Sequence, residues 1–215
     1  MIWSSIIVPT TYLQPFNLPT VKMIRESDLL HKGVELIVVR DVWRNANRAR
    51  NVGIAAASGD IICVMDDDIN LNIDVLHRLL SNMANINEGF YINLDPHFII
   101  ARREALLRVG GYDERLKPCM GDDVELMLRL QKAGYKKLDL PIDDLEVLHL
   151  PAPRDRRDRY LLNQKHLTWA YLEHREFPVW RLFLRKNPIE TARRLKWILE
   201  WLLYRRWISR SIFTG

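Results

Sequence analysis

Apolar and polar residues follow one another along this chain in blocks that predict strands and helices in turn. Short apolar runs rich in β-branched residues predict buried strands, and they occupy residues 4–8, 35–39, 61–65, 90–94 and 98–101. Longer segments with apolar residues at helical spacing predict helices, and they cover residues 21–31, 45–57, 74–83, 103–109 and 122–133. Because strands and helices alternate through residue 101, we expect an α/β fold in which a mostly parallel sheet has helices on both faces.

Proline-rich segments indicate the loops and the domain boundary. Residues 9–20 contain three prolines and no glycine, and we expect an ordered loop after the first strand. Pro151 and Pro153 precede a charged stretch. We therefore predict one domain over residues 1–150 and a helical C-terminal extension over residues 151–215.

Length and composition are those of a globular chain with one domain, or one domain and an appendage. The chain has 215 residues, of which 48% are hydrophobic and 27% are charged. Its two cysteines, Cys63 and Cys119, form no disulfide framework, which favours a reducing compartment. Residues 1–5 lack the features of a secretory signal, and no apolar run approaches membrane-spanning length. We expect a cytoplasmic protein, soluble or peripheral on the membrane.

Charge is distributed unevenly along the chain. Residues 1–150 carry 17 Lys and Arg against 21 Asp and Glu, whereas residues 151–215 carry 15 against 6. The basic extension must therefore meet an anionic partner or pack against the acidic body. Its basic residues are interleaved with a wide apolar face, so nucleic acid is not an expected partner, although steep salt dependence would reveal one.

The C-terminal extension is also rich in tryptophan, with five of the seven in the chain. These five are Trp169, Trp180, Trp197, Trp201 and Trp207. A helix is predicted over residues 191–208, with Pro188 at its start. Two interpretations stay open: the helix docks on the body or on a second subunit in a homodimer, or it lies in a membrane interface.

Three consecutive aspartates, Asp66, Asp67 and Asp68, end the apolar run 61–65. Ligands of open α/β sheets bind at the carboxyl ends of the strands. Clustered carboxylates repel one another and are costly to desolvate, so a cation is their natural neutraliser. Oxygen ligands without cysteine or a nearby histidine pair favour Mg²⁺ or Mn²⁺. The alternative is a solvated acidic turn that leads into the next helix at Asn72.

A second acidic pair, Asp122 and Asp123, follows Gly121 at the start of a predicted helix. The positive end of the helix dipole stabilises carboxylates there, and Asp122 alone would be explained as an N-cap. With two acidic loops, one site could hold a metal while the other takes a proton from a substrate hydroxyl. This hypothesis requires the two loops to meet.

Five motifs occur along the chain in a characteristic order: ELIVV, ARNVGIAAASGDIICVMDDD, GGYDERL, GDDVELMLRLQKAGY and VLH. In this order they resemble the family 2 inverting glycosyltransferases of the GT-A fold, and the resemblance covers residues 4–150. It implies transfer of a sugar from a UDP-, GDP- or dTDP-sugar to a hydroxyl of a glycan or lipid-linked acceptor. It also implies a divalent metal, Mn²⁺ or Mg²⁺.

The resemblance implies a role for each matching residue. Asp68 would bind the metal, and His149 would complete its coordination unless that histidine is structural. Asp123 would be the general base, with Asp122 beside it assisting acceptor binding. The residues implied to contact the nucleotide are Pro9, Thr10, Asp41, Arg50, Asp66 and Asp67. Three arginines either add positive charge over the diphosphate or form a solvated basic loop; they are Arg154, Arg156 and Arg157.

The sequence departs from the family pattern at three points. Arg40 replaces an acidic residue of many relatives, so we expect recognition of the nucleotide base to be altered. The loop after Thr10 lacks the usual Tyr-Asn-Arg. Only 41 residues separate Asp68 from Gly110, which predicts a compact pocket or one that the C-terminal extension completes.

Two other functions compete with glycosyl transfer. A sugar-nucleotide nucleotidyltransferase has related architecture but needs a glycine-rich phosphate loop, and residues 9–20 contain no glycine. A catalytically silent binding protein on the same fold is the other alternative, and an intact Asp68 and Asp123 argue against it.

Overall fold

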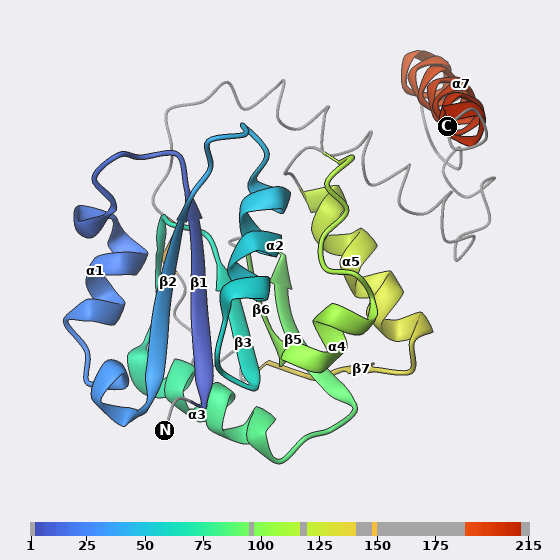
Figure 1. The fold of residues 1–215 in the computed structure, drawn as a ribbon. Coiled ribbons are helices and arrows are strands. Elements are labelled where there is room, and N and C mark those ends of the chain that lie inside the picture. The colour runs from blue at the N-terminus through green and yellow to red at the C-terminus, as the bar shows by residue number, and fades with distance from the viewer. Residues whose placement is uncertain (1–2, 95–96, 117–119, 141–147, 150–187, 212–215) are drawn as a thin grey trace.

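The computed structural model describes residues 3–94, 97–116, 120–140, 148–149 and 188–211. Its centre is a six-stranded sheet with the strand order β2-β1-β3-β6-β5-β7, and helices flank this sheet on both sides (Figure 1). The α/β fold class predicted from the sequence is confirmed.

The sheet is mixed but mostly parallel. Its strands are β1 (Ser4–Thr10), β2 (Val34–Arg40), β3 (Ile61–Met65), β5 (Gly89–Leu94), β6 (His97–Arg102) and β7 (Lys136–Lys137). β1 pairs in parallel with β2 and β3, and β5 pairs in parallel with β7. β6 is antiparallel to both of its neighbours, β3 and β5. All five strands predicted from the sequence are present.

The reversed direction of β6 follows from its connection to β5. Leu94 ends β5 and pairs with His97, the first residue of β6. A connection this short can join antiparallel strands only, because a parallel pair needs a crossover of a dozen or more residues. As a result β6 starts at the edge of the sheet where β1 and β3 end.

Alternating residues of the strands form two apolar layers, one on each face of the sheet. The helices are α1 (Pro19–Arg25), α2 (Ala46–Ala56), α3 (Ile73–Ala84), α4 (Arg103–Arg108) and α5 (Met120–Lys132). Ile6 and Cys63 face a layer that α1 and α3 cover. Ile7 and Val64 face the opposite layer, which α2, α4 and α5 cover. The predicted helices on both faces are therefore confirmed.

The predicted helix over residues 21–31 is wrong in its extent. α1 ends at Arg25, and a separate 3-10 helix, η2 (Leu29–Lys32), follows and stops at Gly33 in the left-handed conformation. The Ser27 hydroxyl donates to the Ile24 carbonyl at 2.6 Å and accepts from the Leu29 amide at 3.3 Å. Such local side-chain bonds compete with those of a helix, which explains the break.

The segment predicted as a loop over residues 9–20 also contains regular structure. β1 continues through Pro9 and Thr10, a short 3-10 helix η1 (Pro15–Asn17) follows, and α1 begins at Pro19.

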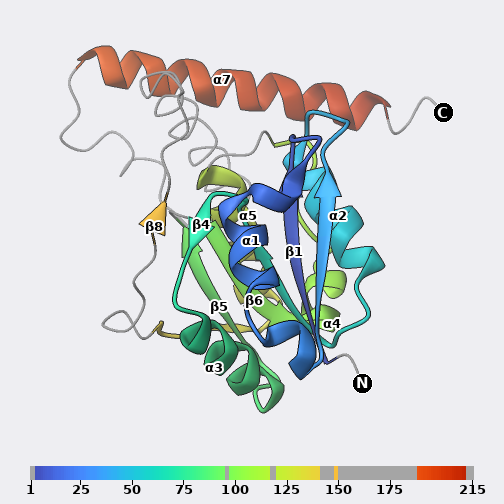
Figure 2. The ribbon, with the colours of Figure 1, turned by 90° about the vertical axis from the view of Figure 1, so that its left-hand side faces the viewer.

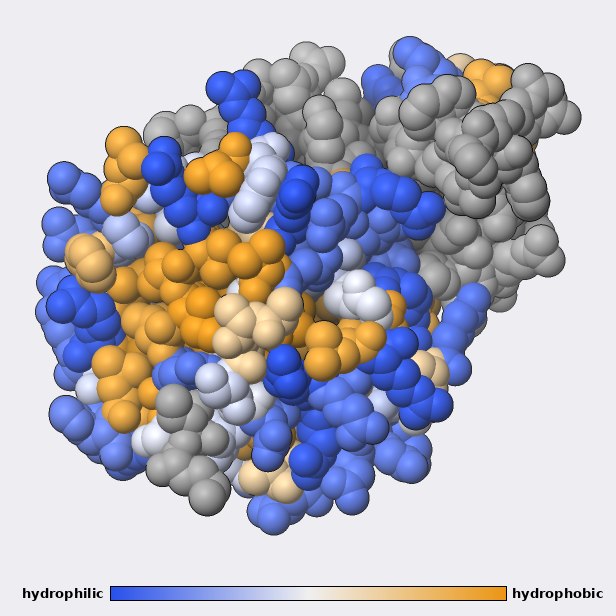
Figure 3. Space-filling model, in the orientation of Figure 1, coloured by the Kyte–Doolittle hydropathy of each residue, from blue (hydrophilic) through white to orange (hydrophobic). Residues whose placement is uncertain are grey.

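Apolar residues gather on the face of the molecule that includes the edge strand β2 (Figure 3). The inner residues of β2 are only half-buried.

The helix predicted over residues 191–208 is present as α7 (Pro188–Ser211) (Figure 2). Four of its leucines are exposed, namely Leu195, Leu199, Leu202 and Leu203. Within the described part of the chain, no helix combines the length and the apolar character needed to cross a membrane. Docking, dimerisation and membrane contact of α7 all stay predictions.

Candidate active site

The three aspartates lie directly after β3, at the carboxyl end of the strand. The Asp66 amide donates to the His97 carbonyl at 3.1 Å, which extends the pairing of β3 and β6 by one step. The buried hydroxyl of Thr20 fixes the rest of the loop: it lies 2.7 Å from the Asp66 carbonyl and accepts from the Ile69 amide at 2.9 Å. Sequence reasoning missed Thr20, because its partners are more than forty positions away.

Asp67 lies within the electrostatic influence of its two acidic neighbours. Burial raises the pKa of Asp67, and the charges of Asp68 and Asp66 raise it further, while a hydrogen bond with Thr10 opposes the shift. A cation beside these carboxylates would relieve this repulsion.

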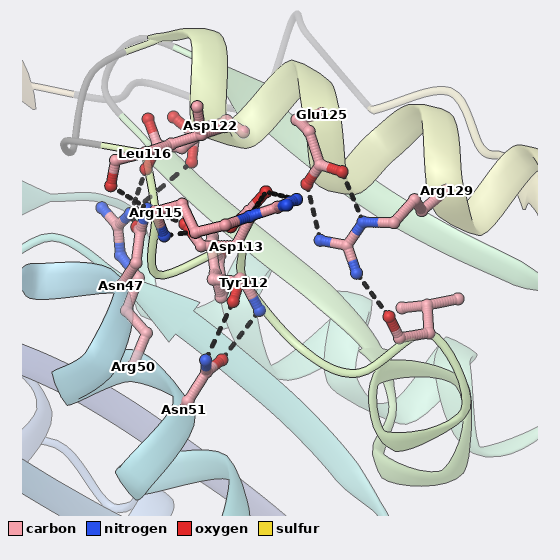
Figure 4. A network of polar contacts seen from close by, with 12 residues as sticks. Asn47, Arg50, Asn51, Tyr112, Asp113, Arg115, Leu116, Asp122, Glu125 and Arg129 are labelled. Carbon is pink, nitrogen blue, oxygen red and sulfur yellow. Dashed lines mark hydrogen bonds and ion pairs between the residues drawn. The ribbon is translucent and has the colours of Figure 1, made fainter. Parts of the chain in front are cut away.

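Arg50, on α2, is the centre of a buried ion-pair network (Figure 4). Its Nη2 lies 2.9 Å from Asp66 Oδ1, and its Nη1 lies 2.8 Å from Asp122 Oδ2 and 2.9 Å from Asn47 Oδ1. Although burial opposes it, the charges of Asp66, Asp123 and Asp122 hold the pKa of Arg50 well above its usual value. Arg50 thus joins the loop after β3 to the first turn of α5, and the two acidic segments meet as the sequence hypothesis required.

Asp123 is buried beside a histidine that the sequence did not single out. Its Oδ1 lies 3.3 Å from His97 Nδ1 and 3.7 Å from Arg50 Nη1. Burial and the charge of Asp122 raise the pKa of Asp123 well above its usual value, although Arg50 opposes them. Burial and Arg50 lower the pKa of His97 to about 3, against smaller opposing effects of Asp66 and the Asn93 carbonyl. His97 is therefore neutral near pH 7.

Tyr112 completes this group. Its hydroxyl lies 2.8 Å from His97 Nε2, and the guanidinium carbon of Arg50 lies 4.9 Å from the centre of its ring. The Gly-Gly-Tyr motif was noted in the sequence, but no role was assigned to its tyrosine. The side chain of Tyr112 is almost fully buried.

Amide side chains of α2 hold the turn that positions Tyr112 (Figure 4). Asn51 Oδ1 accepts from the Tyr112 amide at 2.7 Å, and Asn51 Nδ2 donates to the Tyr112 carbonyl at 2.9 Å. Asn47 Nδ2 lies 3.1 Å from the carbonyls of both Asp113 and Leu116. Gly111 has φ of +68°, and a Cβ there would lie 2.4 Å from Asn51 Oδ1. A glycine is therefore required at this close approach.

α5, which carries Asp122 and Asp123, is tied to the same turn. Arg129 forms two hydrogen bonds of 2.6 Å with the Glu125 carboxylate and donates to the Val109 carbonyl just before the turn (Figure 4). α2, the glycine turn and α5 thus form one connected support around Arg50.

The loops after β1 and β2 bring the other predicted nucleotide contacts to the same edge of the sheet. Pro9 and Thr10 are the last residues of β1. The Asp41 amide donates to the Thr10 carbonyl at 2.7 Å, so Asp41 lies next to them. Asp41 Oδ1 accepts from the amides of Trp43 and Asn45 at 3.1 and 2.9 Å.

The remaining predicted site residues follow residue 147. The backbone of β8 (Leu148–His149) pairs with β4 (Ile69–Asn70), and His149 lies opposite Ile69, the residue after Asp68. Three predicted diphosphate contacts lie outside the described residues: Arg154, Arg156 and Arg157.

The donor set at this edge fits a hard divalent cation. The described residues contain no group of three His, Cys, Asp or Glu side chains that could hold a metal by themselves. Mg²⁺ is often bound by one or two carboxylates together with substrate phosphates. Asp68, whose charge repels that of Asp67, supplies such a carboxylate.

Comparison with solved structures defines the class of fold. A mannosyltransferase, PcManGT from Pyrobaculum calidifontis, aligns over 92% of this chain and 74% of its own, with a TM-score of 0.63 at 15% identity. TarS 1–349 of S. aureus aligns over 93% of this chain and 80% of its own, with a TM-score of 0.55 at 11% identity. The chain has the GT-A fold of glycosyltransferases.

Sequence comparison then gives the family. The family model described as glycosyl transferase family 2 matches residues 5–110, and the chain is similar to this family over that segment. N-acetylglucosaminyl-diphospho-decaprenol L-rhamnosyltransferase of Mycobacterium tuberculosis is 38% identical over 89 residues, which is 40% of this chain. That match spans only 28% of the length of the relative.

Proposed function

We propose that this protein is an inverting glycosyltransferase that moves a sugar from a nucleotide-diphosphate sugar to an acceptor hydroxyl, with Asp123 as general base. One observation carries the proposal: Arg50 joins the loop after β3 to the start of α5, so a donor-binding edge and a buried base belong to one site. The match to the family model over residues 5–110 supports the same class of reaction.

The donor would bind along the carboxyl edge of the sheet. The loops after β1 and β2, with Thr10 and Asp41, would contact the nucleoside, and Asp66 and Asp67 would lie against the ribose. PcManGT was solved with GDP-Man and Mn²⁺, which supports a nucleotide sugar as donor. The nucleotide of the donor sugar is left open among UDP, GDP and dTDP.

A divalent cation would be held by Asp68, with His149 as a further ligand. When bound, Mn²⁺ or Mg²⁺ would supply positive charge to the departing diphosphate. The repulsion between Asp67 and Asp68 supports a cation at this place. The arginines at positions 154, 156 and 157 would add charge on the same side.

The transfer itself is a single displacement at the anomeric carbon. The acceptor hydroxyl gives its proton to Asp123 while its oxygen bonds to the anomeric carbon, and the bond to the diphosphate oxygen breaks. The raised pKa of Asp123 suits this role, because a base works best when its pKa lies near the working pH. Asp122 is fully buried and forms an ion pair with Arg50. This favours a role in positioning Arg50 over direct binding of the acceptor.

The acceptor would be a glycan or a lipid-linked sugar. The mycobacterial relative is named for a decaprenol-linked acceptor, which supports the lipid-linked alternative. We propose a cytoplasmic protein in which the exposed leucines of α7 contact a membrane surface or a second copy of the chain.

Two substitutions separate donor binding from transfer. Asp68→Ala should weaken metal-dependent nucleotide binding, whereas Asp123→Asn should abolish transfer and leave donor binding largely intact. The measurements are nucleotide titration by calorimetry and nucleotide release from the donor sugar. Asp60→Asn is the matched control, because this exposed aspartate precedes the opposite end of β3. Equal loss of donor binding in the Asp68 and Asp123 variants would contradict the assigned roles.

A further inference from the structure

Three buried side chains from separate elements lie in a row that ends in the proposed base. Tyr112 comes from the glycine turn, His97 from the start of β6 and Asp123 from α5, and each is 4% exposed or less. The Tyr112 hydroxyl lies 2.8 Å from His97 Nε2, and His97 Nδ1 lies 3.3 Å from Asp123 Oδ1. Nothing in the assigned donor or base chemistry uses His97 or Tyr112.

Arg50 cannot serve as the hydrogen-bond donor to Asp123 in this arrangement. Its Nη1 carries two hydrogens, and Asn47 Oδ1 and Asp122 Oδ2 lie 2.9 and 2.8 Å from that nitrogen. Asp123 Oδ1 is more distant, at 3.7 Å. Arg50 therefore supplies charge to Asp123, and His97 Nδ1, at 3.3 Å from Asp123 Oδ1, is a closer donor position than Arg50 Nη1.

The proton on His97 can occupy only one of its two ring nitrogens, because the neutral imidazole has a single N–H. If Tyr112 donates to Nε2, the Nδ1–H faces Asp123 Oδ1. If instead Nε2–H donates to Tyr112, a lone pair on Nδ1 faces the carboxylate and repels it. An ionised Asp123 therefore selects the first tautomer.

We propose that His97 and Tyr112 are positioning residues for the base: Tyr112 fixes the tautomer of His97, and His97 Nδ1–H holds Asp123 Oδ1 so that Oδ2 meets the acceptor. This inference rests on the proposed function. Neither Nδ1 nor Oδ1 makes a hydrogen bond of ordinary geometry within the described residues. Catalytic contacts are often long before substrate binds and tighten in the complex.

His97 and Tyr112 would also set the acid limb of the profile of kcat/KM against pH. The groups that face Asp123 are Asp122 on its own helix, Arg50 on α2, Asp66 after β3, and His97. Asp122 and Asp66 disfavour the ionised carboxylate, whereas Arg50 and a donating His97 favour it. Loss of the His97 donor should therefore move the acid limb of the profile to higher pH.

The first test reads the tautomer directly and needs no turnover. Histidine-selective ¹⁵N labelling of the full chain gives spectra of its six histidines, and the signals of His97 are those lost in His97→Asn. We expect a neutral ring with Nδ1 protonated and Nε2 bare at pH 8.5, where ionisation of Asp123 is most favoured. An Nε2-protonated ring at pH 8.5, or a ring that becomes positively charged between pH 8.5 and pH 5.5, would overturn the inference.

The second test compares two substitutions of the histidine in kcat/KM against pH. The amide nitrogen of His97→Asn can replace Nδ1 as donor, whereas His97→Leu removes the donor. We expect His97→Leu to lose about tenfold more activity on the acid side than on the alkaline side, and His97→Asn to keep the wild-type acid limb. Tyr112→Phe should shift the limb in the same direction as His97→Leu, but less.

The outcomes separate this inference from the proposed function. If the wild-type protein releases no nucleotide from any UDP-, GDP- or dTDP-sugar, the proposed function fails, and the positioning role falls with it. If the wild-type protein is active and His97→Leu lowers kcat/KM equally at every pH, or if His97→Asn behaves as His97→Leu does, only the positioning role is overturned.

Discussion

Arg50 is the residue on which the electrostatics of the site depend. It is nearly fully buried, and it contacts carboxylates from two loops that are far apart in sequence. Breaking a buried ion pair by removing one partner leaves an uncompensated charge, which costs about 3–5 kcal/mol. Arg50 is therefore needed for the fold of the site before any substrate arrives.

The substitution Arg50→Met tests this role. We expect the free energy of unfolding at pH 7 to fall by about 3–5 kcal/mol, because Asp122 and Asp123 lose their buried cation. The measurement is urea denaturation followed by circular dichroism. Arg48→Met is the control, since Arg48 lies on the exposed side of the same helix and its guanidinium lies over the Trp43 ring. Similar losses in both variants would show that the buried network contributes little.

The pKa of Asp123 predicts how stability changes with pH. Because its pKa is raised in the folded protein, the folded state binds more protons than the unfolded state between the two pKa values. Its contribution to stability is therefore most favourable at low pH and is lost as the pH rises through the folded pKa. Asp123→Asn removes this effect.

We expect Asp123→Asn to be more stable than the wild-type protein at pH 8, with the difference shrinking toward pH 5. Thermal unfolding of both proteins over this range is the measurement. A stability difference that is constant across the range, or that grows as the pH falls, would contradict the raised pKa.

Among the elements, the turn at Gly110 and Gly111 links α4 to the base-bearing helix. Both glycines have positive φ, +82° and +68°, but their surroundings differ. A Cβ at Gly110 would meet nothing within 4 Å, whereas one at Gly111 would lie 2.4 Å from Asn51 Oδ1. The amide of Asn51 pairs with both backbone groups of Tyr112 at this point.

The two alanine substitutions at this turn should therefore differ. Gly110→Ala carries only the left-handed backbone penalty of about 1–2 kcal/mol. Gly111→Ala should cost about 1–3 kcal/mol more, because the Asn51 amide must move and its hydrogen bonds to Tyr112 are lost. Chemical denaturation measures both. Equal costs would mean that Asn51 adjusts without loss.

Sequence reasoning succeeded for elements whose signal is local. The run Ile61–Met65 is apolar, β-branched and bounded by Gly59 and the aspartates, and it is a buried strand. It failed where a single side chain redirects the backbone, as Ser27 does after α1. It also gave no direction for β6, because strand direction depends on connection length and neighbours rather than on the composition of the strand.

The site was predictable only in part for the same reason. The acidic clusters are visible as neighbours in sequence, and the placement of Asp66 through Asp68 at a strand end is confirmed. The partners of Arg50 lie 16 and 72 positions away from it. His97 and Tyr112 look like ordinary core residues in the sequence, and only the pairing of β6 with β3 brings His97 to Asp123.

At the scale of the whole molecule, the site extends beyond the segment that the family model matches. The family model matches residues 5–110, whereas the proposed base lies on α5. The ion pair between Arg50 and Asp122 connects the matched segment to α5. Under the proposed function, the donor edge lies in the matched segment, and this connection adds a candidate base to it.

The most direct test of the proposed donor site is a calorimetric titration of the full chain with UDP, GDP and dTDP, each with Mn²⁺ and again with EDTA. We predict that one nucleotide binds in the presence of Mn²⁺ and that EDTA abolishes its binding. Asp68→Ala should lose the same binding, and Asp60→Asn should keep it. Failure of all three nucleotides to bind to the folded protein would contradict the donor site and favour a catalytically silent binding protein on the GT-A fold.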